Sequence, residues 1–374
     1  MDMSANIEKL CTEAIAAKTF PGCVVGYIRD GQTVLSAYGH QRYEDSGSPV
    51  ELDTIYDVAS VTKSVVTGSV AMKLIELGRL NLDDAVTQYI PELATKYRND
   101  VRIRHLLTYT ITFELTEGIA DIAKHTPDEV FQTLCAAELV APPGQSYRYT
   151  NGPAILLAAV IERASREPLD VLAKRFFFDP LGMATSTLHP ELLPRLRIAP
   201  TEIDWRGEVR AVVHDEAAWA MMQHGQLAGN AGLFSTAGDL LTFCQMLLDE
   251  GRFRSTQLLS PETVHDMHTN QIMIAGECTS FGWELDWSKT FGNVVSAQAF
   301  GKTGFTGCVI VIDPVKKAAL VHLSNRTYPT RPTTKKLLVQ FRRALGQLVF
   351  AELPDMSEEF LPFFKPAQIA TAQE

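Results

Sequence analysis

The segment Ser60-Val61-Thr62-Lys63 carries two side chains that could together perform nucleophilic catalysis. It opens a run of apolar residues at helical spacing, and residues three apart on a helix share a face, so we expect Lys63 beside Ser60. A serine hydroxyl is a weak nucleophile until a base takes its proton, and a desolvated lysine can be that base. The helix dipole would favour a developing oxyanion. Serine is also a common N-cap residue, so this spacing alone leaves a purely structural role open.

A Tyr-x-Asn pattern occurs twice, at residues 97–99 and 149–151. The first copy lies in a charged stretch that is typical of a surface loop. The second follows a Pro-Pro-Gly turn and directly precedes an apolar helix, which would hold its side chains toward a cleft. Tyr149 beside two lysines could act as a general base, and the Asn151 amide could orient a lysine and a substrate. Alternatively, Asn151 only caps the following helix.

The third motif is GKTGFTG at residues 301–307, between two strand-like runs. Glycine in a strand lets another backbone or a substrate approach closely, and Lys302 would add a positive charge to a cleft. A phosphate-binding loop is excluded because the GxxxxGK[ST] spacing is absent and no helix follows. A plain hairpin bulge remains the alternative.

The elements that must position these motifs are strands at both ends of the chain and helices between them. Strand signals cover 23–29, 33–38, 308–312 and 318–323, and helix signals cover 5–18, 152–166, 238–250 and 334–351. Asp30-Gly31 is a hairpin signal between the first two strands. The simplest architecture pairs the terminal strands in one antiparallel sheet, flanked by helices, and inserts a mostly helical region.

This pattern predicts an α/β (α+β) fold in two parts. Residues 1–56 and 262–374 would form a discontinuous sheet domain, and 57–261 a mostly helical domain, with the active site at their interface. We expect the last twenty residues to form a tail that lies on the surface or packs by its phenylalanine pair. No linker or internal repeat divides the chain.

Composition excludes several classes of protein. The chain has 374 residues, 46% of them hydrophobic and 21% charged, which is typical of a globular protein. A net charge of −10 disfavours nucleic-acid binding. No run of 18 apolar residues could span a membrane, and the N-terminus has no apolar signal core. If Met1 is the native start, we expect a cytoplasmic protein.

The remaining chemistry-bearing residues favour structural roles. The six cysteines are scattered without a CxxC pair, which indicates reduced buried thiols, and we expect no metal and no cofactor. His214-Asp215 could be a catalytic pair, but a cleft-lining or structural role is favoured. His105 resembles a hydrogen-bonded core histidine. Trp283 and Trp287 either line an acyl pocket or pack in the core, and we favour packing.

Together and in this order, the three motifs resemble those of the serine β-lactamase and penicillin-binding-protein superfamily. The Tyr-x-Asn motif is similar to that of its class C branch, which includes the family VIII carboxylesterases. Further segments resemble the family as well: PPGQSYRYTN, DPLGMATSTL, LAGNAGLFSTAGDLLTF, VIDP and LSNRTYPTR. The resemblance covers most of residues 20–335 and implies a β-lactamase/transpeptidase-like fold.

The resemblance implies a catalytic role for three residues. Ser60 is similar to the acylated nucleophile, Lys63 to the adjacent base or proton relay, and Tyr149 to the group that activates Ser60 and then the deacylating water.

It also implies substrate-binding roles. Asn151 would orient Lys63 and the substrate, and Lys302 would tune Tyr149 and steer a carboxylate. Thr303, Gly304 and Phe305 would contact substrate, with the backbone N–H groups of Ser60 and Phe305 forming an oxyanion hole.

Three departures from the family pattern bear on the substrate. LLTYTITFE follows His105 where many relatives have LLTHTSGL, which changes a loop. In LSNRTYPTRP, Thr327 and Thr330 replace two asparagines of class C lactamases, and Arg331 is out of step. Asn230 stands where close relatives often have histidine.

These observations predict a serine hydrolase that forms an acyl-enzyme at Ser60 and acts on a small ester, amide or β-lactam. A carboxylesterase with weak or no β-lactamase activity is favoured. A β-lactamase, a D-amino-acid peptidase or amidase of the same fold, and a non-catalytic binding module are the alternatives. The oligomeric state is left open.

Overall fold

The computed structural model describes residues 3–43, 47–115, 117–125, 129–332 and 335–352. The C-terminal tail, which the sequence suggests lies on the surface or packs by its phenylalanine pair, lies entirely outside these described residues.

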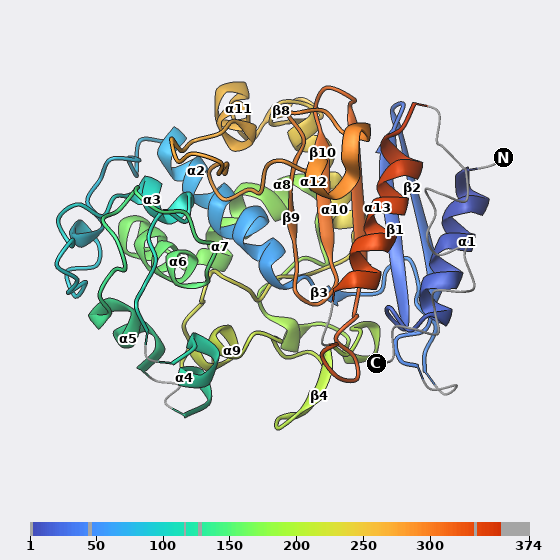
Figure 1. Cartoon of the computed structure of the whole chain (residues 1–374), viewed down its shortest axis with the longest axis horizontal. Helices are drawn as coiled ribbons and strands as arrows, with labels where there is room; N and C mark the ends of the chain where they lie inside the picture. Colours follow the sequence, from blue (N-terminus) through green and yellow to red (C-terminus); the bar gives the residue numbers. More distant parts are fainter. Residues whose placement is uncertain (1–2, 44–46, 116, 126–128, 333–334, 353–374) are drawn as a thin grey trace.

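A five-stranded antiparallel sheet runs in the order β2-β1-β11-β10-β9 (Figure 1). Its strands are β1 (Gly22–Arg29), β2 (Gln32–Gly39), β9 (Phe300–Thr303), β10 (Val309–Asp313) and β11 (Ala318–Ser324). Since β1 pairs directly with β11, the prediction that strands from both ends of the chain share one antiparallel sheet is confirmed.

The β1–β2 hairpin follows from its turn residues. Arg29 lies opposite Gln32, so Asp30 and Gly31 are the two turn residues. Their φ angles are 52° and 72°, the left-handed values of a type I′ turn. Asp and Gly tolerate these values better than other residues, and the turn therefore sets the register of the whole hairpin.

Helices cover both faces of the sheet, as the alternation along β1 requires. Cys23, Val25 and Tyr27 join the apolar cluster under α1 (Met3–Ala16) and α13 (Lys336–Phe350). Val24 and Ile28 belong to the other cluster. On that opposite face lies α10 (Ala237–Leu248), which contacts β1, β10 and β11. The sequence division at residue 261 groups this segment with the helical region, whereas its contacts assign it to the sheet.

The other end of the molecule is mostly helical (left in Figure 1). Its main elements are α2 (Ser69–Glu76), α3 (Ile103–Leu107), α4 (Ile119–His125), α5 (Val130–Ala136), α6 (Gly152–Ser165), α7 (Leu169–Ala173), α8 (Asp179–Leu181) and α9 (Glu216–Gln223). Between the two ends come α11 (Pro261–His268) and α12 (Ser288–Phe291). A mixed fold with an antiparallel sheet and an inserted helical region is thus as the sequence predicts.

The helix that the sequence predicts from Ser60 onward is not a regular α-helix at its start. A 3₁₀ turn, Ala59–Val61, leads into a π-helical turn, Lys63–Gly68, before α2 begins. Two hydroxyls in the π turn are bound by distant backbone carbonyls: Ser64 donates to Gly282 over 2.5 Å and Thr67 to Gly229 over 2.6 Å. These long-range contacts explain why local periodicity did not reveal the wider turn, a feature frequent at functional sites.

The burial of other residues agrees with the sequence analysis. All six cysteines are free and five of them are buried. Trp283 and Trp287 are 1% and 4% exposed, which confirms that they pack in the core. Among the described residues, no helix combines the length and apolarity that crossing a membrane requires.

A buried histidine should make the stability of the fold sensitive to acid. His322 of β11 is fully buried, with its ring 5.2 Å from that of Phe20 and 4.9 Å from that of Phe341. Burial, and then the charge of Arg342, lower the pKa of His322 to about 3. The folded state therefore holds this ring neutral, whereas the unfolded chain binds a proton below about pH 6.5. The resulting stability is complete above pH 6.5 and is lost progressively toward pH 3.

We expect His322→Phe to flatten the dependence of the unfolding free energy on pH between 7 and 4, removing about 3 kcal/mol of its change. Urea titrations at several pH values measure this, with the exposed His40→Gln as control. An unchanged slope in His322→Phe would show that this ring does not titrate on unfolding.

Candidate active site

Lys63 lies against the hydroxyl of Ser60. Its Nζ donates to Ser60 Oγ over 2.9 Å and to the carbonyl oxygen of Asn230 over 2.8 Å. Lys63 is 2% exposed, while Ser60 is partly exposed. The hydroxyl is therefore open to a substrate on one side and hydrogen-bonded to a buried amine on the other.

The turn before Ser60 is fixed by the buried Asp57 at the end of β3 (Tyr56–Asp57). One carboxylate oxygen accepts from the backbone N–H of Ala59 over 2.8 Å, and the other from that of His214 over 2.7 Å. Ala59 has a φ of 48°, a left-handed value that is uncommon for alanine. Local propensity does not favour this backbone, so the long-range contacts of Asp57 hold the nucleophile in place.

Tyr149 completes the group at Ser60. Its ring centroid is 3.8 Å from Lys302 Nζ and 5.3 Å from Lys63 Nζ, and 38% of the residue surface is exposed. The ring of Tyr109 meets it edge-on, with centroids 5.1 Å apart. Burial alone would raise the pKa of the Tyr149 phenol, but the charges of Lys302 and Lys63 and a hydrogen bond with Ser60 hold it below its ordinary value. The structure thus places a partly exposed, acidified phenol beside the hydroxyl.

The two lysines have opposite electrostatic environments. Burial, together with the charge of Lys302, lowers the pKa of Lys63, although Tyr149 acts in the other direction. Burial also disfavours the charge on Lys302, but Glu284, Tyr149 and Tyr109 together outweigh it, and the pKa of Lys302 lies above its ordinary value. Lys302 therefore stays an ammonium, while Lys63 is the more readily deprotonated amine.

The GKTGFTG segment forms the end of β9 and the turn after it. Gly304 packs against the backbone before Ser60, since a Cβ on it would lie 2.4 Å from the carbonyl oxygen of Val58. This contact brings Phe305, which is 40% exposed, close to the nucleophile-bearing turn. Lys302 and Thr303 are both hydrogen-bonded to the carboxylate of Glu284. The GKTGFTG segment therefore lies against the turn that carries Ser60.

Asn151 lies near this group, but its amide binds Asp215 and not Lys63, while its predicted contact with the substrate stays a prediction. Its amide donates to Asp215 over 3.0 Å, and Lys63 is instead bound by the carbonyl oxygen of Asn230. Asp215 also accepts from the amide of Asn230 over 3.0 Å. Asn151 occupies the N-cap position of α6 without a side-chain capping bond, so capping does not explain it either.

His214 and Asp215 do not form a catalytic pair. The imidazole of His214 contacts Glu202 over 2.8 Å and stacks on Phe305 at 5.6 Å between ring centroids. Asp215 caps α9 by accepting from the backbone N–H of Ala218. His105 contributes to the capping of α3, so it is hydrogen-bonded as expected.

Four residues of the site had no assigned role in the sequence analysis: Tyr109, Asp215 as an anchor of two amides, Asn230 and Glu284. Three of them lie in segments singled out for other reasons, as a departure from the family or as a possible histidine pair. Glu284 lies in the segment between Trp283 and Trp287. Its partnership with Lys302 becomes visible only once this segment pairs with β9. The charge of Lys302 inside a strand was the one signal that an acid had to lie beside it.

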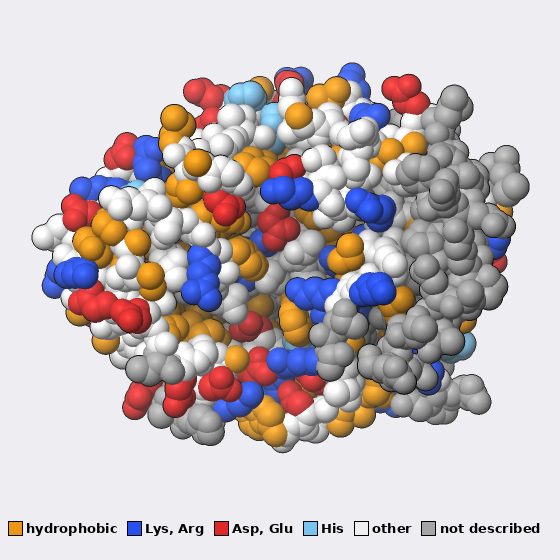
Figure 2. Space-filling model, in the orientation of Figure 1, with side chains coloured by type: hydrophobic (Ala, Val, Ile, Leu, Met, Phe, Trp, Pro, Cys, Tyr) orange, Lys and Arg blue, Asp and Glu red, His pale blue; other side chains and the backbone are white. Residues whose placement is uncertain are grey.

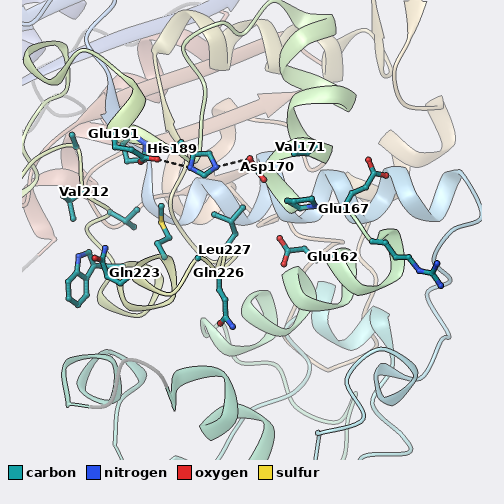
Figure 3. A pocket seen from close by; sticks show the side chains of 18 residues that line it. Glu162, Glu167, Asp170, Val171, His189, Glu191, Val212, Gln223, Gln226 and Leu227 are labelled. Atoms are coloured by element: carbon teal, nitrogen blue, oxygen red, sulfur yellow. Dashed lines mark hydrogen bonds and ion pairs between the residues drawn. The ribbon is translucent and has the colours of Figure 1, made fainter.

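A separate pocket of about 790 Å³ lies between α6, α7 and α9 and is lined by other residues than those at Ser60 (Figure 3). His189 stands at one side, where its two ring nitrogens contact Asp170 over 3.0 Å and Glu191 over 3.1 Å. Glu162 accepts from the backbone N–H of Leu169. Since these polar groups bind one another, the pocket offers no reactive group comparable to Ser60.

Charged side chains of both signs are interspersed over the face shown in Figure 2. Within the described ranges, no group of three or more His, Cys, Asp or Glu side chains is placed to hold a metal ion.

This arrangement of fold and site is that of a serine hydrolase of the β-lactamase type. The family model described as "Beta-lactamase" matches residues 7–343, and the chain belongs to this family.

Known relatives agree with that class. A protein of Escherichia coli O157:H7 named "Putative D-alanyl-D-alanine carboxypeptidase" is 31% identical over 350 residues, which cover 83% of this chain and 79% of the relative. The octameric penicillin-binding protein homologue from Pyrococcus abyssi superposes with a TM-score of 0.70 at 26% identity, covering 88% of this chain and 75% of that one. EstCE1, a hydrolase with promiscuous acyltransferase activity, shares the fold with a TM-score of 0.73 at 20% identity, over 91% and 97% of the two chains.

Lys302 should set the acidity of Tyr149. Removing its charge in Lys302→Met raises the phenol pKa, so we expect the rise of Ser60 reactivity with pH to shift by about 1–3 units toward alkali. The rate of covalent labelling by a fluorophosphonate, measured against pH, reports this shift. Lys96→Met is the matched control, because Lys96 lies 5.0 Å over the ring of Tyr97, in the other Tyr-x-Asn motif. A profile that does not move in Lys302→Met would contradict the assignment.

Proposed function

We propose that this protein hydrolyses small carboxylic esters through an acyl-enzyme at Ser60. The observation that carries the proposal is the grouping of a partly exposed hydroxyl, a buried amine of lowered pKa and an acidified phenol at one point. Each of these features is costly to maintain in a folded protein and serves proton transfer to and from the hydroxyl.

In the acylation step, the Tyr149 phenolate takes the proton of Ser60, with Lys63 as the relay that holds the hydroxyl. Ser60 Oγ then forms a bond to the ester carbonyl carbon, and the carbonyl electrons move to its oxygen. The backbone N–H groups of Ser60 and Phe305 are the proposed donors to this oxyanion, each contributing about 3–4 kcal/mol. When the tetrahedral intermediate collapses, the C–O bond to the alcohol breaks, and the alcohol leaves with the proton held by Tyr149.

Deacylation repeats these steps with water as the nucleophile. Tyr149 takes a proton from water, the hydroxide adds to the acyl carbon, and the bond to Ser60 Oγ breaks as the proton returns to Ser60. Lys302 remains positively charged throughout and stabilises the phenolate. Water enters only in this second step, where it supplies the hydroxide that replaces Ser60 on the acyl carbon.

The surroundings of Arg331 favour an ester over a β-lactam. Arg331 is already bound by two carboxylates, Glu202 over 2.7 Å and Glu216 over 2.6 Å. Thr327, one of the residues that depart from the family pattern, is fully buried. A substrate carboxylate would therefore find this arginine neutralised, which supports a substrate without that group.

A D-alanyl-D-alanine carboxypeptidase is the second candidate, and the similarity to the Escherichia coli protein of that name favours it. The chemistry at Ser60 would be the same, with an amine in place of the alcohol. A non-catalytic binding module is disfavoured because such a protein has no need of two buried lysines beside a partly exposed serine.

A panel of three substrates separates these candidates. We expect turnover of p-nitrophenyl butyrate, little or none of nitrocefin, and little release of D-alanine from a D-Ala-D-Ala peptide. Ser60→Ala should lower ester turnover by at least about 10³-fold with an unchanged circular dichroism spectrum. Peptide release that exceeds ester turnover would establish the second candidate, and full activity in Ser60→Ala would refute the nucleophile.

The two Tyr-x-Asn motifs provide a matched pair of variants. Tyr149→Phe removes the proposed base and should slow both acylation and deacylation, by about 10²–10⁴-fold. Tyr97→Phe makes the same chemical change in the other motif and should leave both rates unchanged. Stopped-flow measurement of the nitrophenol burst and of the steady state reports the two steps separately. The reverse pattern would mean that Tyr97 is the base.

A further inference from the structure

The carboxylate of Glu284 is bound by three donors from two neighbouring residues of β9. Lys302 Nζ lies 2.6 Å from Oε1, the backbone N–H of Thr303 lies 3.2 Å from Oε2, and the Thr303 hydroxyl lies 3.3 Å from Oε2. An ammonium, a hydroxyl and an amide that converge on one carboxylate form a complete receptor for that group.

Backbone pairing holds Glu284 in this receptor. Glu284 donates to the carbonyl of Gly301 over 2.9 Å and accepts from its N–H over 3.1 Å, so its segment pairs with the outer edge of β9. The neighbouring Trp283 is buried against Phe243 and Phe300. The acid is therefore anchored on both sides and is positioned by the fold rather than by a mobile loop.

The charges explain why a second carboxylate would be disfavoured here. Lys302 is 1% exposed, whereas the side chain of Glu284 is 27% exposed. The ammonium of Lys302 is thus buried, and the carboxylate that compensates it is the more exposed group of the two. A substrate that brought its own carboxylate would meet Glu284 before it could reach Lys302, and like charges in contact cost several kcal/mol.

We infer that Glu284 is a specificity-determining residue, an internal carboxylate that fills the receptor made by Lys302 and Thr303 and so restricts the enzyme to substrates without a carboxylate near the reacting bond. This inference rests on the proposed function and narrows it to neutral esters. It is an alternative to the expectation that Lys302 steers a substrate carboxylate, since that lysine already binds a carboxylate of the chain itself.

Arg326 and Lys335 are the other cations to consider, at 5.4 and 5.8 Å from the ring of Phe305. Arg326 donates to the carbonyl of Phe305 over 3.1 Å. Neither cation is hydrogen-bonded to Glu284 in the described residues, so a carboxylate bound by them would not depend on Glu284, and a variant of Glu284 tells the two positions apart.

The test uses two substrates that differ in charge and by one methyl group: the mono-p-nitrophenyl ester of glutaric acid and the same compound with its free acid as a methyl ester, with release of p-nitrophenol measured for both. We expect the protein to prefer the neutral compound by at least about tenfold in kcat/KM. Glu284→Gln should reduce this preference by about tenfold or more, because it removes the repelling charge and frees the ammonium. The ratio is informative because any effect on the basicity of Tyr149 changes both rates equally.

Glu277→Gln is the matched control, since it removes one negative charge from an exposed position in the same part of the chain and should leave the ratio unchanged. Glu284→Asp, which keeps the charge but withdraws it by one methylene group, should give an intermediate ratio and serves if the glutamine variant does not fold. An equal preference in the wild type, or one that Glu284→Gln leaves intact, would overturn the inference while leaving esterase activity established.

A binding measurement keeps the inference testable if neither ester is hydrolysed, an outcome that would count against the proposed function alone. Titration calorimetry of the Ser60→Ala protein with phenylacetate and phenylacetamide compares a carboxylate with its neutral counterpart. Adding Glu284→Gln should strengthen phenylacetate binding about tenfold relative to phenylacetamide. No relative change would refute the role of Glu284.

Discussion

The site depends on the burial of two lysines beside one hydroxyl. An ammonium taken out of water must be neutralised, or it must be compensated by charge and hydrogen bonds. The two lysines of this site differ in how the cost of burying an ammonium is met. Lys302 is compensated by Glu284 and keeps its charge, whereas Lys63 is bound by the Asn230 carbonyl and the Ser60 hydroxyl, and its pKa falls. One amine thereby becomes a fixed positive charge, and the other a group that can exchange a proton.

This difference governs Tyr149, which lies between the two amines. A phenol is too weak an acid to be a base at neutral pH unless positive charge stabilises its ionised form. Lys302, at 3.8 Å from the ring, contributes the larger part of that stabilisation. The Glu284 carboxylate therefore holds the charge of Lys302, which lowers the pKa of the Tyr149 phenol, which in the proposed reaction activates the Ser60 hydroxyl. Removing Glu284 would change the electrostatic surroundings of each of these groups.

Sequence alone predicted the parts of this structure that local rules determine. Ser60 and Lys63 are three residues apart, and Asp30-Gly31 dictates a two-residue turn, so both were accessible from short-range geometry. Tyr149 and Lys302 were accessible because their motifs resemble those of a known family. The π turn after Ser60, the packing of α10 on the sheet and the pairing of Glu284 with β9 depend on contacts between distant segments. No local pattern of residues encodes these three features, so they could not be predicted from the sequence.

Asp215 shows how far the support of the site extends from the reacting atoms. Its carboxylate binds the amides of Asn151 and Asn230 and caps α9, so it ties the start of α6 and the loop at Asn230 to one helix end. The carbonyl of Asn230 is then aimed at Lys63, and Lys63 at Ser60. The resemblance assigns the orientation of Lys63 to Asn151. In the structure the Asn230 carbonyl binds Lys63, and Asp215 holds Asn230 in place. Because a carbonyl accepts a hydrogen bond without adding charge, it can hold Lys63 without raising its pKa as a carboxylate in the same place would.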